Sequence, residues 1–356
     1  MKHHHATIAA VFLAAVLPFG AVAQEQVPIT ISASHPTTVP WVGALQTFVV
    51  EPANARLEAM GSDYRIEWQE AFGGSLYDFN ETLEAVEEGL TDMGWVGALW
   101  EPSKMPLQNI MFATPFVTSD PVLAVEVLNE MNDTMPAMQE EWEKHNLVFL
   151  GASVNDTYHL LTQFPVESLD DLEGRKIVGA PALGPWLSGT GAIAVSGGLP
   201  SMYQQMQTGV AEGTIIIPTG AYPLRLHEVA PNVTLVDTGV TTTGGLAVNA
   251  DSWARFPDDV KTVLKELGRE YSLGHAQVVK DRHDFVLQKM EEEGATVTSL
   301  PDADKQRWVD GLPDLGKTWV DQVESAGAPG GEIMARFMAE AQERGATPLR
   351  DWSAGL

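Results

Sequence analysis

The stretch Ser168–Gly213 reads SLDDLEGRKIVGAPALGPWLSGTGAIAVSGGLPSMYQQMQTGVAEG, and it decides the expected fold. Its pattern predicts a turn, a short strand, a loop, a helix and a second turn. In α/β proteins, small ligands bind at the loops that follow the carboxyl ends of strands. The stretch therefore predicts a ligand-binding loop on an α/β lobe.

The same alternation of strands and helices extends in both directions from this stretch. Strand patterns precede it at residues 29–33, 65–69, 92–96 and 147–153, and another follows at 243–249. Amphipathic helical patterns lie between them, and the longest runs over residues 257–293. This order predicts an α/β protein with parallel sheets, in which the strand at 243–249 returns to the first lobe.

Composition restricts both the partners and the chemistry. A chain of 356 residues exceeds what one compact core normally supports, so we expect two lobes. The formal net charge of -27 argues against nucleic acid or an anionic membrane as a partner. The chain has no cysteine, which excludes disulfides, thiolate catalysis and cysteine-ligated metal centres.

Residues 1–23 are expected to be a secretory signal peptide. Lys2 supplies the positive start, residues 8–16 form the apolar run, and Ala21-Val22-Ala23 is the small-residue cleavage site. The apolar run is too short for a permanent membrane span. We therefore expect an exported, soluble mature chain. In that chain, lobe I is expected over residues 24–152 plus about 241–280, lobe II over 153–240 plus about 281–325, and a C-terminal helical segment over about 326–356.

Several motifs, in order along the chain, resemble those of one protein family. Phe72-Gly73-Gly74-Ser75-Leu76 is followed by Glu84–Gly94, which contains a G-x-x-D-M pattern. Leu169–Ile177 matches D-L-x-G-x-K-I, and Tyr203–Gly213 is similar to Y-x-A-L-Q-x-G-V-V-D-G. In this order, the chain resembles the solute-binding subunits of tripartite ATP-independent periplasmic (TRAP) transporters, the DctP-like family.

The resemblance implies a fold and a role. The fold is α/β, two-lobed and similar to type II periplasmic-binding proteins, with crossing strands and a long helix that spans the lobes. The lobes would close by hinge motion on a small organic ligand, usually a carboxylate. The loaded protein would then meet the small and large membrane permease subunits in the periplasm. The resemblance implies no catalysis and no ATP, and we expect no cofactor and assign no metal ligand.

The expected ligand anchors depart from the family pattern. The residue after K-I is usually an arginine that holds the ligand carboxylate, but here it is Val178. The nearest match to a second, earlier basic residue is His159, which either binds the ligand or is satisfied within the fold. The usual polar pair after D-G is replaced by Ile215–Ile217. Together these losses favour a less charged ligand, or one held by other donors.

Hydroxyl groups, backbone N–H groups and aromatic rings near strand ends are the remaining candidates. Rings would bind an aromatic ligand by stacking or a quaternary ammonium by cation–π contacts. We expect at least two of the aromatic side chains to face the cleft between the lobes. The candidate ligand-binding residues are Trp41, Phe72, Gly73, Gly74, Ser75, Trp95, Tyr158, His159, Val178, Ala180, Trp186, Tyr203, Ile216, Thr219, Tyr222 and Thr242.

These observations predict a binding protein for an aromatic or partly apolar organic acid. The same role for an aliphatic carboxylate or a cationic osmolyte is the alternative, and a binding protein of an ATP-driven importer, an exported enzyme or a ligand sensor are the rival classes. Gly189–Ala194 formally fits the dinucleotide motif G-x-G-x-x-A, but that motif must directly follow a strand. Here a loop with two prolines separates it from Ile177. The sequence contains neither G-x-S-x-G nor H-E-x-x-H.

Overall fold

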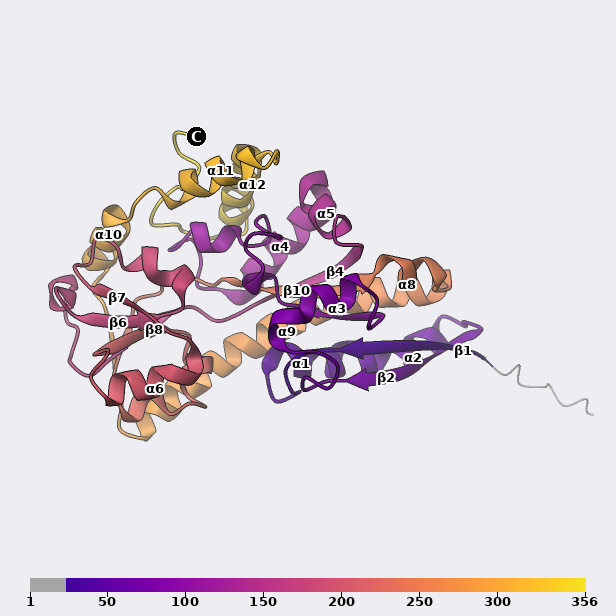
Figure 1. Cartoon of the computed structure of the whole chain (residues 1–356), viewed down its shortest axis with the longest axis horizontal. Helices are drawn as coiled ribbons and strands as arrows, with labels where there is room; N and C mark the ends of the chain where they lie inside the picture. Colours follow the sequence, from indigo (N-terminus) through magenta and orange to yellow (C-terminus); the bar gives the residue numbers. More distant parts are fainter. Residues whose placement is uncertain (1–23) are drawn as a thin grey trace, which may run out of the picture.

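The computed structural model describes residues 24–356, so the expected signal peptide at 1–23 lies outside the described residues. The chain forms two lobes, each built on one β-sheet, and a long helix crosses between them (Figure 1). The predicted α/β class and two-lobed arrangement are thereby confirmed.

Lobe I contains a five-stranded sheet in the order β2-β1-β3-β10-β4. Strands β1, β2 and β3 run parallel, whereas β10 is antiparallel to both of its neighbours. The carboxyl ends of the three parallel strands therefore meet at one edge of the sheet. The strands are β1 (Glu25–Ser32), β2 (Tyr64–Ala71), β3 (Met93–Val96), β4 (Leu147–Val154) and β10 (Thr242–Asn249).

Short helices pack around this sheet. A π-helical turn, η1, lies just before Pro52. Pro52 lacks the N–H that would bond to the Phe48 carbonyl, so the regular ladder cannot close there. The helices are α1 (Pro40–Leu45), η1 (Gln46–Val50), α2 (Glu51–Ala59), α3 (Thr82–Glu87), α4 (Pro121–Thr134), α5 (Pro136–Glu143) and α8 (Ala250–Arg255).

Lobe II contains a six-stranded sheet in the order β11-β9-β5-β8-β6-β7. Strand β5 is antiparallel to its neighbours β8 and β9, and β6 is parallel to β7 and β8. The strands are β5 (His159–Thr162), β6 (Lys176–Gly179), β7 (Ile193–Ser196), β8 (Gly213–Ile216), β9 (Asn232–Leu235) and β11 (Thr296–Ser299), and the helical segments are η5 (Leu169–Leu172), η6 (Pro181–Leu187), α6 (Leu199–Gln207), α7 (Pro218–Ala221) and η7 (Leu226–Glu228).

The stretch Ser168–Gly213 has the predicted turn, strand, loop and helix, with one strand more than expected. The turn is η5, the strand is β6, the loop contains η6, and the helix is α6. The additional strand is β7, which begins two residues after Gly191 and pairs with β6. The G-x-G-x-x-A match therefore leads into a strand rather than a helix, which removes the structural context that a dinucleotide site requires.

Two strand connections and one helix join the lobes. The chain passes from β4 to β5 and returns from β9 to β10, so both of these connections cross between the two sheets. The 35-residue helix α9 (Asp258–Glu292) runs the length of the molecule (Figure 1). Near its start Leu264 and Leu267 pack in the lobe I core, and near its end Met290 packs in the lobe II core.

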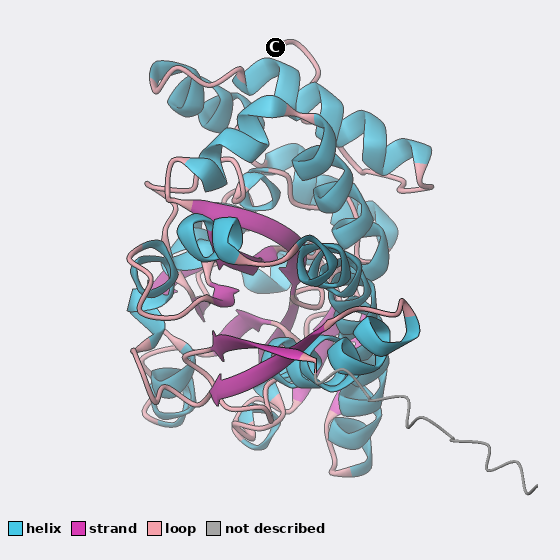
Figure 2. Cartoon of the chain, turned by 90° about the vertical axis from the view of Figure 1, so that its right-hand side faces the viewer, coloured by secondary structure: helices cyan, strands magenta, loops and turns pink. Residues whose placement is uncertain are grey.

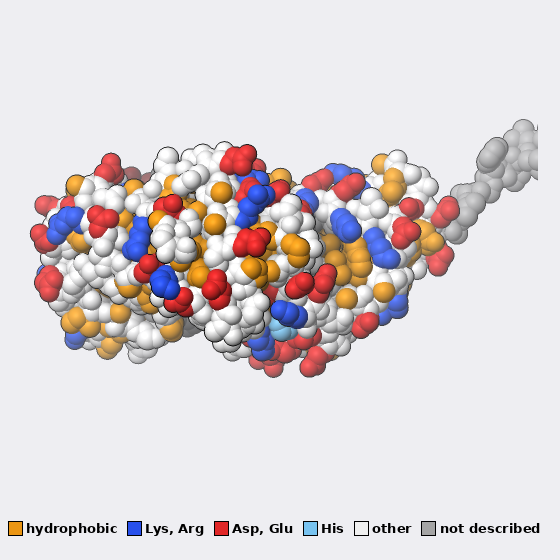
Figure 3. Space-filling view, turned by 90° about the horizontal axis from the view of Figure 1, so that it is seen from above, with side chains coloured by type: hydrophobic (Ala, Val, Ile, Leu, Met, Phe, Trp, Pro, Cys, Tyr) orange, Lys and Arg blue, Asp and Glu red, His pale blue; other side chains and the backbone are white. Residues whose placement is uncertain are grey.

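The C-terminal helices α11 (Leu315–Ser325) and α12 (Gly330–Glu343) pack on each other at the top of the molecule, seen from two sides in Figure 1 and Figure 2, whereas α10 (Asp302–Gly311) packs on η5 of lobe II. Helix α12 packs on α4, and α11 packs on the 3-10 turn η4 (Ile110–Ala113). Viewed from this side, acidic and basic side chains are interspersed over both lobes (Figure 3). Among residues 24–356, no helix combines the length and apolar composition needed to cross a membrane.

Candidate ligand-binding site

Four aromatic side chains meet at the carboxyl-terminal edge of the lobe I sheet, and we call His35, Trp41, Trp95 and Trp100 the aromatic cluster. The ring of His35 stacks on Trp100, with centroids 5.7 Å apart and planes 8° apart. His35 also meets Trp41 and Trp95 edge-on, at 5.6 and 5.8 Å. Phe79 lies 5.4 Å from Trp100 and is 47% exposed. The cluster is therefore continuous from the buried Trp95 to the surface.

Strand ends and the loops after them position these rings. His35 and Trp41 follow β1, Trp95 lies near the end of β3, and Trp100 ends the 3-10 turn η3 (Ala98–Trp100) that follows β3. Loops at the carboxyl ends of parallel strands are where α/β proteins bind ligands. The cluster thus occupies the edge of lobe I that the topology makes available for binding.

The loop after β2 supports the cluster from one side. The Gly73 N–H donates to the His35 carbonyl at 2.9 Å, and the Gly74 N–H donates to the Ala33 carbonyl at 3.2 Å. Both glycines have φ near +75°, which a residue with a Cβ rarely adopts (φ 76° and 73°). In this structure their N–H groups are therefore committed to the fold rather than free as ligand donors. Phe72 is half-buried against the lobe I core, and Ser75 is exposed.

Some polar atoms of the aromatic cluster have hydrogen-bond partners, and one does not. The Trp95 Nε1–H donates to Ser153 Oγ at 2.9 Å, and His35 Nδ1 lies 2.9 Å from Ser34 Oγ. The Trp41 Nε1–H is buried and has no partner among the described residues. Burial lowers the pKa of His35, which favours its neutral imidazole. The cluster therefore offers a donor, Trp41 Nε1, to a ligand that brings an acceptor.

A second group, which contains the predicted residues Tyr158 and Thr219, lies where the chain crosses between the lobes, and we call Asn155, Asp156, Tyr158, Thr219 and Thr241 the crossover network. Asp156 accepts hydrogen bonds from the Thr219 N–H at 3.0 Å and from Thr219 Oγ1 at 2.5 Å. The Asn155 side-chain amide donates to Tyr158 Oη and to Thr241 Oγ1, both at 2.9 Å. Burial raises the pKa of Asp156. The network ties the loop after β8 to both crossing strands.

Hydrogen bonds connect the two groups. Ser153, the acceptor for Trp95, is 2.8 Å from Thr243 Oγ1. Ser153 and Thr243 lie on β4 and β10, two residues away from Asn155 and Thr241 of the crossover network. Thr242, between them, is buried and donates to the Ser153 carbonyl at 3.5 Å.

Trp186, another predicted residue, contacts Tyr158 of the crossover network in the core between the lobes. The rings of Tyr158 and Trp186 pack edge-to-face at 5.5 Å, and Trp186 Nε1–H donates to the Phe112 carbonyl at 2.9 Å. Both side chains are buried. In this structure they support the crossing strands, and their contact with a ligand stays a prediction.

Several predicted residues of lobe II lie in its core rather than beside the aromatic cluster. Val178 and Ile216 are buried in an apolar group that Tyr203 of α6 partly covers. Ala180 is half-buried at the start of the η6 loop and lines a pocket of about 210 Å³. Tyr222 donates to Glu293 at 2.7 Å, at the end of α9. Ligand contacts of these residues therefore stay predictions.

Both ring nitrogens of His159 have hydrogen-bond partners within the fold. Its Nδ1 accepts the N–H groups of Val236 and Asp237 at 3.2 and 3.3 Å, and its Nε2 lies 3.0 Å from Nε2 of His283. The side chain has no exposed surface. His159 was expected either to bind the ligand or to form its hydrogen bonds within the fold, and this geometry favours the second interpretation. The neighbouring basic residue of the β6 entry, Arg175, pairs with Glu212 at 2.8 Å.

Three residues of these two groups were not predicted from the sequence. His35 joins Trp41 and Trp95, and Asn155 and Asp156 join Tyr158 and Thr219. His35 directly follows a predicted strand, as Trp41 nearly does, so the same position rule applied to histidine would have found it. Nothing in the local pattern of Asp156 distinguishes it, because its partner lies 63 residues away.

Two buried histidines predict how the free energy of unfolding depends on pH. Burial lowers the pKa of His159 to about 3 and that of His275 to about 4, whereas an unfolded histidine titrates near 6.5. Between these values the unfolded chain binds more protons, so the free energy of unfolding falls as the pH drops below about 6.5. At pH 5 each histidine is expected to account for about 2 kcal/mol. Urea unfolding at pH 7.5 and pH 5 measures the loss.

A variant separates the contribution of His275 to the free energy of unfolding from that of the acidic surface groups, which also titrate. His275→Gln keeps a donor for the Val154 carbonyl but cannot titrate, so it should lose about 2 kcal/mol less than wild type on acidification. Equal losses in the two proteins would contradict the prediction.

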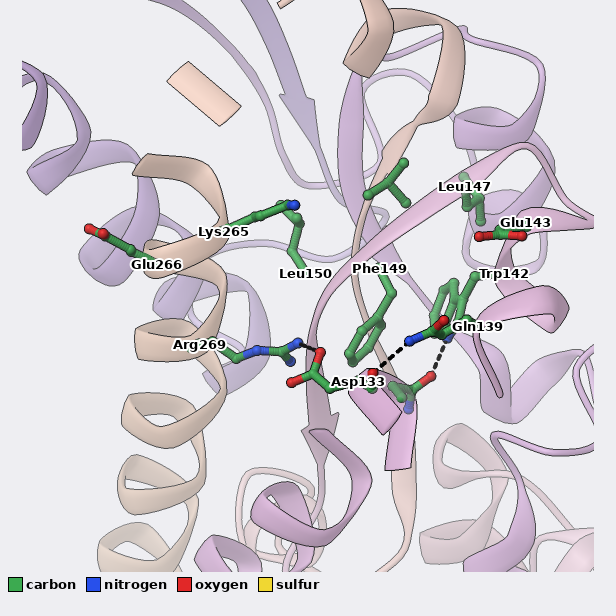
Figure 4. A pocket seen from close by; sticks show the side chains of 12 residues that line it. Asp133, Gln139, Trp142, Glu143, Leu147, Phe149, Leu150, Lys265, Glu266 and Arg269 are labelled. Carbon is green, nitrogen blue, oxygen red and sulfur yellow. Dashed lines mark hydrogen bonds and ion pairs between the residues drawn. The ribbon is translucent and has the colours of Figure 1, made fainter. Parts of the chain in front are cut away.

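The largest cavities lie elsewhere. One, of about 580 Å³, lies beside the edge strand β4 and is lined by Trp142, Phe149, Lys265 and Arg269 (Figure 4). Among its charged groups, Arg269 bonds to Asp133. None of the predicted site residues lines it. Among residues 24–356, no group of three or more His, Asp or Glu side chains is arranged to hold a metal ion.

Comparison with known proteins places the chain in a family. A family model described as bacterial extracellular solute-binding protein, family 7 (DctP), matches residues 35–321. The chain is 29% identical over 188 residues to a solute-binding protein of Sulfitobacter sp. (strain NAS-14.1), which covers 52% of this chain and 54% of that protein. It is 25% identical to the C4-dicarboxylate-binding periplasmic protein DctP of Rhodobacter capsulatus, over 62% of this chain and 66% of that one. It is 22% identical to the ectoine-binding periplasmic protein TeaA of Halomonas elongata, over 75% and 78%. The matched segment thus spans about half the length of the Sulfitobacter relative.

Solved structures share the fold. A TRAP periplasmic solute-binding protein from Desulfovibrio salexigens superposes with a TM-score of 0.76 at 21% identity, covering 90% of this chain and 97% of that one. A TRAP solute-binding protein from Rhodoferax ferrireducens, in complex with benzoate, gives 0.73 at 16% identity, covering 89% and 98%. A marine metagenome TRAP protein specific for aromatic acid ligands gives 0.73 at 18% identity, covering 89% and 99%.

Two lobes, each with a parallel-stranded edge, joined by crossing strands and one long helix, define the class of solute-binding proteins. The family match extends over most of the chain, and the chain belongs to the DctP family of bacterial extracellular solute-binding proteins. The family and the fold are those of transport proteins rather than enzymes. TRAP proteins of this family are periplasmic.

Proposed function

We propose that the chain binds a small organic solute between its lobes and delivers it to the small and large membrane subunits of a TRAP transporter. Family membership and the two-lobed fold support this role. Lobe closure would bury the ligand and complete its contacts. The expected signal peptide at residues 1–23 would place the mature chain in the periplasm, where the membrane subunits could receive it.

The favoured ligand is a ring-bearing or partly apolar organic acid, and the aromatic cluster carries this proposal. Its rings reach from Trp95 in the sheet edge to the exposed Phe79, so a flat ligand could stack against a continuous aromatic surface. Aromatic pairs add about 0.5–1.5 kcal/mol each beyond the area that they bury. The buried, unpartnered Trp41 Nε1–H would supply a donor for a hydroxyl or carboxylate oxygen.

The replaced arginine supports the same class of ligand. Val178 stands at the position where the family usually has an arginine, and its side chain is fully buried among apolar neighbours. Arg175 is paired with Glu212 and stacks over Phe164 at 4.2 Å. A ligand whose binding depends on two carboxylates would lack an arginine partner at these positions, whereas an acid held mainly through its ring would not need one.

Thermal unfolding in the presence of candidate ligands tests the proposal. Benzoate, 3-hydroxybenzoate, succinate, galacturonate and ectoine represent the ligand classes of the relatives and the alternatives. A ligand at 100 times its Kd stabilises the folded state by about 2.7 kcal/mol, which raises the melting temperature by several degrees. We expect this shift with the aromatic acids. A shift with succinate alone would overturn the aromatic class, and one with ectoine alone would favour the cationic osmolyte, because tryptophan faces also bind cations.

A further inference from the structure

Strand β7 forms one edge of the lobe II sheet, and its outer side has no partner strand among residues 24–356. On its inner side it pairs in parallel with β6 (Figure 1). The N–H groups of Ile193 and Gly197 donate to the carbonyls of Arg175 and Gly179, at 2.8 and 3.0 Å. The odd-numbered residues of this segment therefore direct their backbone groups towards β6.

The backbone groups of Ala194 and Ser196 consequently point to the open edge, because they alternate along a strand. Both residues are exposed. Among the described residues, Gln205 alone bonds to these groups: its side-chain amide donates to the Ser196 carbonyl at 3.4 Å, and a carbonyl can accept a second hydrogen bond. Proteins protect open strand edges with charges or prolines, but residues 189–199 contain neither. The edge thus remains able to pair with another strand.

The surface around β7 is almost uncharged in a strongly acidic chain. Residues 177–224 contain one charged side chain, Glu212, although charged residues make up 19% of the chain and the net charge is -27. Glu212 pairs with Arg175 at 2.8 Å. Apolar side chains of the same stretch are exposed, with Ile193 at 51% and Leu199 at 40%. Two copies of the chain repel each other through their acidic surfaces, and this stretch lets them approach at a low electrostatic cost.

We propose that two copies of this chain associate through β7, with the two β7 strands antiparallel across a two-fold axis. A two-fold contact uses the same patch on both copies, so the patch must be complementary to itself. An uncharged strand edge with unpaired backbone groups meets this condition, whereas a patch of like charges does not. The inference is independent of the proposed function and of the solute that the protein binds.

One register uses both open residues of each copy. In an antiparallel pair, two residues that face each other with their backbone groups exchange both hydrogen bonds. Ala194 of one copy would face Ser196 of the second copy, with Val195 on the two-fold axis. Ile193 would then lie opposite Gly197, which has no side chain to obstruct it. A charged side chain, Glu173, lies close to Gly191, which is outside the paired residues.

The contact is small, so we expect a weak dimer. Strand β7 has four residues, whereas a stable interface buries about 800 Å² on each partner. Exposed groups beside the strand, such as Leu199, would have to add to it. We expect a dissociation constant of roughly 10–100 μM. Because the acidic copies repel each other, salt should strengthen the association, whereas a contact built on ion pairs would weaken.

Sedimentation velocity of the wild-type protein tests the association. At about 2 μM the protein should be mostly monomeric, and at about 200 μM mostly dimeric. Raising NaCl from about 0.03 to about 0.3 M should increase the dimer fraction. A monomer at the higher protein concentration in both salt concentrations would overturn the proposal, and so would a dimer that salt dissociates.

The variant Ala194→Lys tests where the contact lies. Ala194 is exposed, so the monomer should stay folded with an unchanged melting temperature. An ammonium at the strand edge should weaken association about tenfold or more, even though it makes the net charge less negative. Ala59→Lys, which changes an exposed alanine at the end of α2 in lobe I, is the matched control and should associate like wild type. Equal association of the two variants would overturn the proposal.

Hydrogen exchange of the wild type locates the contact without any substitution. The N–H groups of Ala194 and Ser196 point to the open edge, so their exchange should slow at least about twofold between low and high protein concentration. The N–H of Val195 faces β6 in both states and serves as the internal reference. A dimer in which Ala194 and Ser196 exchange as fast as in the monomer would place the contact elsewhere and overturn the proposal.

Discussion

Replacing Trp100 by alanine is expected to weaken the binding of benzoate about fivefold or more. Trp100 stacks on His35 at 5.7 Å and contacts Trp95 and Phe79 edge-on at 5.4 Å, so it joins the buried and exposed parts of the aromatic cluster. Loss of its ring removes a stacking surface and frees His35 to move. Two lost aromatic contacts correspond to about 1–3 kcal/mol, and about 1.4 kcal/mol is a tenfold change in Kd. Titration calorimetry with benzoate measures the effect.

Trp68→Ala is the matched control, because Trp68 is another half-buried tryptophan of lobe I but lies in the middle of β2. It should cost stability without changing Kd. Trp41→Phe tests the hydrogen bond, since it keeps an aromatic ring but removes the unpartnered Nε1–H together with one ring of the indole. An unchanged Kd in Trp100→Ala, with binding of benzoate established, would show that the cluster does not contact the ligand.

Gly244→Ala is expected to destabilise the fold by more than 3 kcal/mol or to prevent folding. Gly244 lies in β10 with φ at +143°, a backbone conformation that residues with a Cβ rarely adopt. A Cβ there would overlap the Val96 carbonyl and lie 2.8 Å from the Ala98 nitrogen. These atoms belong to the end of β3 and the turn that carries Trp100, so the clash would also displace the aromatic cluster. Urea unfolding measures the loss.

Gly61→Ala separates backbone strain from the clash. Gly61 also has a positive φ, at +75°, but nothing lies within 4 Å of the position of its Cβ. It should cost only about 1–2 kcal/mol. If Gly244→Ala lost no more than Gly61→Ala, the close approach of β10 to the turn after β3 would not be needed for the fold.

The elements of the fold follow from local pattern, which is why most of them could be predicted. The long helix was expected over residues 257–293 and is found at Asp258–Glu292, since its apolar stripe is regular. Strand β7 could not be predicted in this way. It is four residues long and mostly exposed, so its side chains show no burial pattern, and it is defined by its pairing with β6.

The candidate site was less predictable, because its members are selected by contacts between distant segments. Trp41 and Trp95 were predicted from their places near strand ends, and these places do bring them together. Trp186 and Tyr158 satisfy the same rule, yet both are buried between the lobes, where the η6 loop packs against Phe112. The fate of His159 depended on His283, and nothing in the sequence around either histidine indicates the other.

Helix α9 has a consequence for how the two lobes can exist. Its first half supplies buried side chains to the core of lobe I, and its last turns supply Met290 to the core of lobe II. Neither lobe thus has a complete interior without a helix that also belongs to its neighbour. The lobes are consequently not exchangeable modules: a chimaera that takes one lobe from a relative must take the facing side of α9 with it, and the protein should unfold as one cooperative unit.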